Sequence, residues 1–293
     1  MRLRQLEYFL AVVAEGSITA AAASLLVAQP SLSSQITALE QEVGAPLLER
    51  LPRGVRLTPA GRAFLAEAST AVLAAGRAGK AARNVRDGLA GELEVATVGS
   101  MAVGVLPPSI EAWHRRRPAA SLRLIEYRHA ELLEQDVAGG VGDLAFGPRP
   151  RREFPIMVDI SVEEFVIVLP PHDPLAAETR IDVSWLAERR WVLFAADHGL
   201  SEVVTAVCAR AGFCPAAAVH TAQVEAAARL AAAGLGPALV PDNVVPPGLR
   251  ATVRPLAEPE LRELVAYARA PLGPLAESYV DALTRTANRP RRR

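Results

Sequence analysis

Residues 18–43 read ITAAAASLLVAQPSLSSQITALEQEV and contain two helical patterns separated by a very short break. The first, about residues 18–26, is rich in alanine, the residue with the highest helix propensity. The second begins at Pro30, where a proline is tolerated because the first helical N–H has no partner within the helix. Its apolar side chains recur at the spacing of one helix face: Leu32, Ile36, Leu39 and Val43. The stretch therefore predicts two helices joined by a tight turn.

The opposite face of the second helix is small, polar and uncharged, with Pro30, Ser33, Ser34, Thr37 and Gln41. A helix face that meets only solvent usually carries Glu and Lys. Short hydroxyl and amide side chains let a helix approach another surface closely and hydrogen-bond to phosphates and base edges. This pattern favours a helix-turn-helix. An ordinary helical hairpin is the alternative that periodicity alone leaves open.

A wider pattern surrounds these helices between Leu3 and Leu65. This run resembles the LysR-type transcriptional regulators, and the matching residues are Leu6, Phe9, Val13, Gly16-Ser17, Ala21-Ala22, Leu25, Ala28-Gln29-Pro30-Ser31-Leu32-Ser33, Gln35-Ile36, Leu39-Glu40, Gly44, Leu47-Leu48, Arg50 and Val55-Arg56-Leu57-Thr58-Pro59-Ala60-Gly61. The resemblance implies double-stranded DNA as a partner. It places the contacts at Gln29, Pro30, Ser31, Ser33, Ser34, Gln35 and Thr37 and at the arginines of a wing. The family often has arginine or histidine at the position of Ser34, so a bidentate arginine contact with guanine is not available there.

The wing is predicted as a hairpin of residues 47–50 and 55–58 around a turn at 51–54. It contains Arg50, Arg53 and Arg56. Over residues 1–60 these three, with Arg2 and Arg4, are balanced by Glu7, Glu15, Glu40, Glu42 and Glu49, so five positive charges meet five negative ones. Three of the five positive charges lie in the wing, which should therefore carry most of the non-specific attraction to phosphate.

A long helix is predicted from Pro59 to about Asp87, with Thr58 as its N-cap and Gly88 and Gly91 at its end. Its apolar stripe includes Phe64, Leu65, Val72 and Leu73, and a helix of this length outside a compact domain needs a partner to bury such a stripe. In the resembling family this helix pairs with its twin in a homodimer, which often doubles to a homotetramer. A long helix within one domain is the alternative.

After Gly91 strands and helices alternate, which predicts an α/β unit. Strands are expected at residues 93–98, 122–126, 143–146, 165–169, 191–194, 219–221, 237–240 and 264–269, and helices at 106–117, 130–138, 201–211, 223–233 and 275–284. This half is also similar to the family's effector-binding domain, through Gly91-Glu92-Leu93, Leu106-Pro107-Pro108, Gly142-Asp143-Leu144-Ala145, Pro174-Leu175-Ala176, Ala211-Gly212-Phe213 and residues 232–241. The implied fold is two Rossmann-like lobes, similar to periplasmic binding proteins.

We therefore expect an α/β chain in three parts. Residues 1–58 form a winged helix-turn-helix, residues 59–89 a linker and dimerisation helix, and residues 90–293 an effector-binding domain. Its first lobe covers about 91–161 and 267–293, and its second about 162–266.

The loops that follow strands of an open α/β sheet meet at one crevice. The expected effector contacts in those loops are Ser100, Met101, His129, Pro148, His198 and Gln223. These residues and the helix that follows the Ser100 loop favour a small anionic or aromatic effector. If His129 and His198 bind an anion as protonated side chains, affinity should rise as the pH falls. An ordinary surface loop is the alternative for each residue taken alone.

Other classes of function lack support in the sequence. No nucleophile, base or metal-ligand spacing emerges, so no enzyme activity, metal or cofactor is expected. Cys208 and Cys214 fit free thiols better than a disulfide. No apolar run reaches membrane-spanning length, and we expect a cytoplasmic protein without a membrane partner. The first rival hypothesis is a cytoplasmic small-molecule binding protein without DNA activity, and a DNA-retardation assay would distinguish it from a DNA-binding regulator. The second is an enzyme built on the α/β half.

Overall fold

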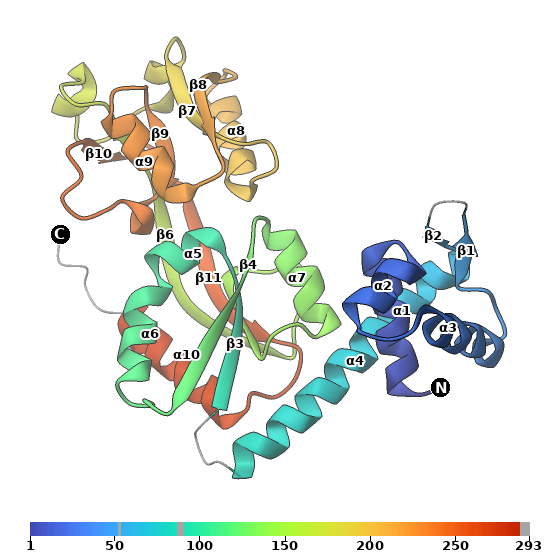
Figure 1. Ribbon diagram of the computed structural model, residues 1–293. Helices are drawn as coiled ribbons and strands as arrows, with labels where there is room; N and C mark the ends of the chain where they lie inside the picture. The colour runs from blue at the N-terminus through green and yellow to red at the C-terminus, as the bar shows by residue number, and fades with distance from the viewer. Residues whose placement is uncertain (52–53, 87–90, 288–293) are drawn as a thin grey trace. The chain divides into compact units, whose positions relative to one another are not determined.

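The computed structural model describes residues 1–51, 54–86 and 91–287 and divides into two compact units, Met1–Arg86 and Asp87–Arg293 (Figure 1). In the described part of the chain no single helix combines the length and hydropathy of a membrane span; only the pair Leu3–Glu15 and Ile18–Ser24, bent by 115° at its break, passes that test jointly.

The first unit is a three-helix bundle followed by a small hairpin and a long helix. Its elements are α1 Leu3–Glu15, α2 Ile18–Ser24, α3 Gln29–Val43, β1 Leu48–Arg50, β2 Val55–Leu57 and α4 Pro59–Arg86. The local signals act as predicted: Gly16 ends α1 at φ 63°, and the Ser17 hydroxyl accepts the Ala20 N–H at 3.4 Å. Thr58 likewise caps α4 by accepting the Gly61 N–H at 3.0 Å.

The core of this unit forms where the helices cross. Leu32, Ile36 and Leu39 of α3 are buried with Phe9 of α1, whose ring lies edge-on to Phe64 of α4 at 5.3 Å. The prediction that Val43 shares this apolar face is wrong, because Val43 is 39% exposed. It lies in the last turn, just before Gly44 ends the helix at φ 77°, and the core does not extend that far.

The hairpin is held to α3 by the carboxylate of Glu40, which accepts the N–H groups of Leu47 at 2.8 Å and Leu48 at 3.0 Å. The Val55 N–H donates to the carbonyl of Gly16 at 2.9 Å. These bonds fix both strands of the hairpin against the helix-turn-helix.

The second unit contains helices α5 Gly99–Gly104, α6 Leu106–His114, α7 Ala130–Gly139, α8 Gly199–Arg210, α9 Val224–Ala232 and α10 Pro274–Ala287, with short 3-10 turns η1 Pro174–Ala177, η2 Val183–Leu186 and η3 Asp242–Val244. Its strands are β3 Gly91–Val98, β4 Ala120–Tyr127, β5 Leu144–Pro148, β6 Ile156–Leu169, β7 Arg190–Phe194, β8 Ala216–Thr221, β9 Ala238–Pro241, β10 Thr252–Pro255 and β11 Leu261–Ala268. The main sheet runs β10-β6-β11-β5-β3-β4, with β9 on β6, and β7 and β8 form a parallel pair.

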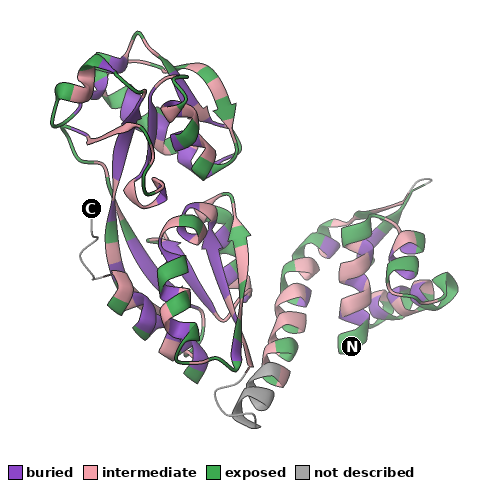
Figure 2. Cartoon of the chain, turned by 60° about the vertical axis from the view of Figure 1, so that its left-hand side comes forward, coloured by how far each residue is buried: buried purple, intermediate pink, exposed green. Residues whose placement is uncertain are grey.

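Two separate hydrophobic cores define two lobes in this unit (Figure 2). Lobe one contains β3–β5, α5–α7 and α10, with the adjoining ends of β6 and β11. Lobe two contains β7–β10, α8, α9 and the 3-10 turns, with the other ends of β6 and β11. The antiparallel pair of β6 and β11 connects the lobes, and its register shifts between Leu264 and Val265.

The predicted helices and strands of this unit are confirmed apart from their ends, but the prediction of a loop at Ser100 and Met101 is wrong, because these residues lie in helix α5. The short 3-10 turns and strand β10 were not predicted, and β6 begins at Ile156 instead of Phe165. The missed half of β6 carries Asp159, Glu163 and Glu164, so its sequence is too polar to resemble a core strand.

Candidate functional site

The candidate nucleic-acid face lies at the start of α3. Gln29, Pro30 and Ser31 are exposed there, as are Ser34 and Thr37 further along the helix. Ser33 and Gln35 are half-buried. This face is free of charged side chains, so it can approach a surface without desolvating an ion.

Two hydroxyls on this face are already oriented by their own helix. The Ser34 hydroxyl donates to the Ser31 carbonyl at 2.8 Å, and the Thr37 hydroxyl donates to the Ser33 carbonyl at 3.1 Å. Each oxygen then offers its lone pairs outward as an acceptor. In the major groove the matching donors are the amino groups of adenine and cytosine.

The predicted wing arginines differ in their surroundings. Arg50 Nη2 donates to the Ser33 hydroxyl at 3.1 Å, which connects the wing to α3. Arg56 binds the Glu49 carboxylate through two N–H groups at 3.1 and 2.7 Å, so its charge is partly offset. Arg53 lies outside the described residues.

A cleft of about 230 Å³ lies between the two lobes of the second unit. It brings together four of the six residues predicted from the loops: Ser100, His129, Pro148 and His198. They come from α5, the start of α7, the end of β5 and the start of α8. The cleft's size suits a small molecule, since it is below the usual range for drug-sized ligands.

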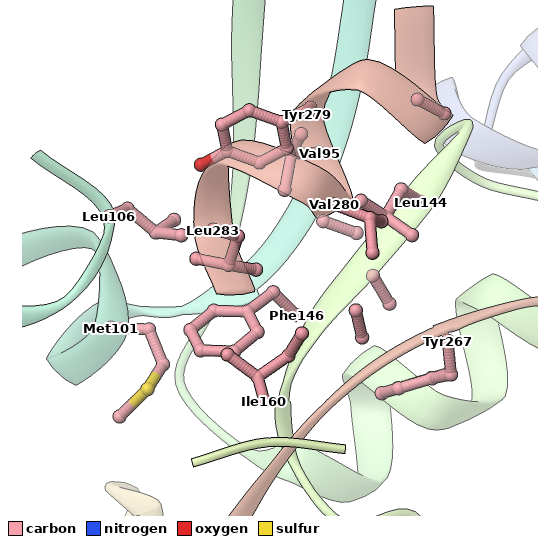
Figure 3. Packing of buried hydrophobic residues seen from close by; sticks show 14 of the residues in the cluster. Val95, Met101, Leu106, Leu144, Phe146, Ile160, Tyr267, Tyr279, Val280 and Leu283 are labelled. Carbon is pink, nitrogen blue, oxygen red and sulfur yellow. The ribbon is translucent and has the colours of Figure 1, made fainter. Parts of the chain in front are cut away.

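Two predicted contacts lie elsewhere. Met101 is fully buried in the core of lobe one, and Figure 3 shows it near Leu106 and Phe146. The helical turn that presents Ser100 to the cleft points the next residue inward. Gln223 is exposed at the start of α9 and does not line this cleft. These placements remove Met101 and Gln223 from the candidate site.

Two helix N-termini face the cleft. His129 is the N-cap of α7 and His198 is the N-cap of α8, and both line the cleft with the residue that follows them. Because a helix N-terminus carries partial positive charge, these two ends favour an anion between them.

The lobes also bind each other directly beside the cleft. The Arg128 guanidinium pairs with the Asp197 carboxylate, and the Gly199 N–H donates to the Arg128 carbonyl at 3.0 Å. Nε2 of His129 lies 2.7 Å from the carbonyl of Asp197. The observed arrangement is therefore one in which the lobes are in contact on this side.

His198 is neutral in this arrangement. Its Nδ1 accepts the Leu200 N–H at 3.1 Å, which requires that nitrogen to be unprotonated, and its ring stacks on Phe194 at 4.9 Å. Burial lowers the pKa of His198, and the nearby charge of His129 lowers it further. The condition that His198 be protonated to bind an anion is therefore not met in this arrangement.

The sequence reading missed the arginines of the cleft, which are Arg128, Arg149, Arg151 and Arg262. Three of them adjoin predicted loop residues: Arg128 precedes His129, while Arg149 and Arg151 follow Pro148. The positive charge of these three residues, next to His129 and Pro148 in the sequence, is the signal that indicates them. Arg262 lies on β11, and nothing local in the sequence brings it to the cleft.

Two family models match the chain over most of its length. The model described as "Bacterial regulatory helix-turn-helix protein, lysR family" matches residues 3–62. The model described as "LysR substrate binding domain" matches residues 86–288. Among curated proteins, the HTH-type transcriptional regulator BudR of Raoultella terrigena is 33% identical over 275 residues, which cover 92% of this chain and 94% of BudR.

Solved structures agree with this match. The crystal structure of CbnR, described as a LysR family transcriptional regulator, is 27% identical, covers 99% of this chain and 100% of its own, and gives a TM-score of 0.72. Full-length CbnR complexed with its target DNA is 28% identical, covers 98% of this chain and 100% of its own, and gives a TM-score of 0.54.

Proposed function

Because this chain belongs to the LysR family of bacterial transcriptional regulators, we propose that the exposed face of α3 reads its DNA target and that the interlobe cleft binds its effector. The protein is a ligand-responsive, sequence-specific DNA-binding regulator. In our proposal residues 1–58 bind DNA, residues 59–89 join two protomers, and residues 90–293 bind the effector. One observation carries this assignment: a helix-turn-helix with an uncharged exposed face and a separate two-lobed unit with a cleft occur in one chain.

On the DNA side, α3 enters the major groove with Gln29, Pro30 and Ser31 leading. Ser33, Ser34, Gln35 and Thr37 lie further along the helix and supply polar contacts without a positive charge. Arg50, Arg53 and Arg56 contact phosphates. Because α3 lacks an arginine for guanine, sequence-dependent DNA shape contributes to the choice of site.

On the effector side, Ser100, His129, Pro148 and His198 contact a small molecule. The N-termini of α7 and α8 and the surrounding arginines favour an anionic group. Binding changes the angle between the lobes. The ligand can control DNA binding only if it stabilises one arrangement of the lobes more than the other.

The protein acts in the cytoplasm, where the bacterial chromosome lies. We assign it no catalytic role, since the described cleft residues do not combine a nucleophile with a base in hydrogen-bonding reach.

The experiment combines DNA retardation with a ligand screen on the full chain. The DNA is the intergenic region beside the protein's own gene, and small metabolites are tested for a change in retardation and for thermal stabilisation. In Ser100→Trp the indole should fill the cleft, so metabolites active on the wild type should lose their effect.

Because Ser100 is buried, Val203→Trp provides a second block at a half-exposed cleft position on α8. Gln223→Trp, outside the cleft, is the matched control and should respond as the wild type does. Equal stabilisation of all four proteins would place the effector elsewhere. If the intergenic DNA is not specifically retarded, the assignment of DNA binding is wrong.

A further inference from the structure

Arg262 and Glu163 form a buried ion pair where the two lobes join. They are directly opposite each other on β11 and β6, so their side chains share one face of the sheet. The Glu163 side chain is 1% exposed and that of Arg262 is 19% exposed. A buried pair of this kind is weak evidence for stability, because desolvation opposes the attraction between the charges. Its position suggests a different role.

The pair holds the guanidinium in one orientation. Glu163 Oε1 accepts a hydrogen bond from Arg262 Nε, and Glu163 Oε2 accepts one from Asn243 Nδ2 of η3. The guanidinium also lies over the ring of Phe165, at 5.2 Å from its centroid. Arg262 is thus fixed through its Nε edge and one face.

The other edge of the guanidinium meets the cleft. Within the described residues Nη1 makes no hydrogen bond, and Nη2 makes only a long one, 3.4 Å to the Ser100 hydroxyl. Arg262 also lines the cleft. Two N–H groups held side by side in this way match the two oxygens of a carboxylate.

The remaining cleft arginines are already paired with acids. Arg149 uses Nε for Glu263 and Nη2 for Asp159, and Arg128 pairs with Asp197. Arg151 pairs with Glu131 and is 80% exposed. Arg262 differs from these three in its enclosure, because its side chain is 19% exposed and those of the others are 43–80% exposed.

We propose that Arg262 determines effector specificity by binding the carboxylate of a small monocarboxylic acid in the cleft. This inference rests on the proposed effector function of the same cleft. One negative charge fits best, since the other cleft arginines are paired with acids and Glu202 also lines the cleft, where it repels anions of higher charge. The carboxylate binds at the Nη edge while Glu163 keeps the Nε edge, so binding leaves the pair of Arg262 and Glu163 intact.

The test is calorimetric titration of the full chain with matched acids and amides: acetate, propionate, butyrate and benzoate against acetamide, propionamide, butyramide and benzamide. Inorganic phosphate is a further probe. The wild type should bind at least one acid at least tenfold more tightly than its amide, and more tightly than phosphate.

The decisive variant is Arg262→Met/Glu163→Gln, which removes both charges and leaves no buried ion unpaired. Its affinity for the acid should fall about ten- to one-hundredfold, the value of a hydrogen-bonded charge pair, while its affinity for the amide stays unchanged. Arg210→Met, at an acid-paired arginine of α8 that does not line the cleft, is the matched control and should change acid binding less than threefold. Thermal unfolding of each variant shows whether it is folded.

Undiminished acid binding by the double variant overturns the role of Arg262 and leaves the effector cleft standing, provided that Ser100→Trp still blocks binding. If the amides or phosphate bind as tightly as the acids, the assignment of a monocarboxylic acid as ligand is wrong, and the effector cleft remains. If no probe binds and no metabolite changes DNA retardation, the inference and the effector function both fail.

Discussion

The buried side chain of His198 makes the stability of the second unit depend on pH. Burial holds the pKa of this side chain below its ordinary value of about 6.5, because the protonated ring would be poorly solvated, and the nearby His129 lowers it further. In the unfolded chain the ring takes up a proton near that ordinary value. The unfolded state therefore binds more protons in the window below it, and stability falls as the pH drops from about 6.5 toward the folded-state pKa.

We expect His198→Asn to flatten this part of the pH dependence. Asparagine retains N-cap capacity and cannot titrate. The urea midpoint of unfolding, followed between pH 8 and pH 5 by tryptophan fluorescence, should fall less in the variant than in the wild type. His220→Asn, at an exposed position on β8, is the control and should keep the wild-type slope. A wild-type slope in His198→Asn would contradict the assignment.

Individual cleft residues differ in how far the sequence could predict them. Ser100, His129, Pro148 and His198 follow strands or precede helices, so the topology alone brings them toward one crevice. Arg262 was missed because its partner Glu163 is 99 residues away, and their pairing depends on a strand register that no local pattern records. Met101 was misplaced because sequence does not show which side of a short helical turn faces the core.

At the scale of elements, the helix-turn-helix was the most predictable part. Its helices are bounded by local signals, such as Gly16, Ser17 and Gly44, whose effect depends on a few neighbouring residues. Strand β10 and the first half of β6 could not be predicted in this way, since their stability comes from pairing with distant strands.

The helix and the wing should contribute differently to DNA binding. Ser33→Ala should weaken the target site about three- to tenfold more than random DNA, because in our proposal its hydroxyl contacts bases. A smaller loss on random DNA is expected as well, since that hydroxyl also holds Arg50 of the wing. Arg53→Ala should weaken target and random DNA alike and lower the salt slope by about one. Arg56→Ala should have a smaller effect, since Glu49 already offsets its charge.

Fluorescence anisotropy on target and random duplexes at several salt concentrations measures all three variants. A uniform loss in Ser33→Ala, equal on both duplexes, would rule out α3 as the reading element.

At the scale of the whole molecule, α4 predicts a dimer. Over residues 59–79, where its side chains are described, only Gly61 and Ala68 are buried. Leu73 is half-exposed and is not part of the core of the first unit. A second α4 is the partner that would cover this stripe, and two helix-turn-helices would then meet two half-sites.

Light scattering at micromolar concentration should give at least twice the 31.1 kDa of one chain. Leu73→Glu should shift the mass toward the monomer, because it would bury a carboxylate between the helices. Ala71→Glu, at an exposed position two residues away, is the control. A monomeric wild type would refute dimerisation, and a fourfold mass would indicate a tetramer.

The paired strands β6 and β11 have a consequence for how such a protein can diversify. The chain leaves lobe one along β6 and returns along β11, so residues 165–260 form one continuous segment whose ends are hydrogen-bonded to each other, from the Phe165 N–H to the Glu260 carbonyl at 2.9 Å. In genetic terms this segment can be exchanged as one piece, because its two boundaries lie side by side in space. Recombination at those two boundaries would exchange half of the cleft while keeping Glu163 and Arg262 with the recipient. New effectors could thus be acquired without altering the helices that contact the promoter.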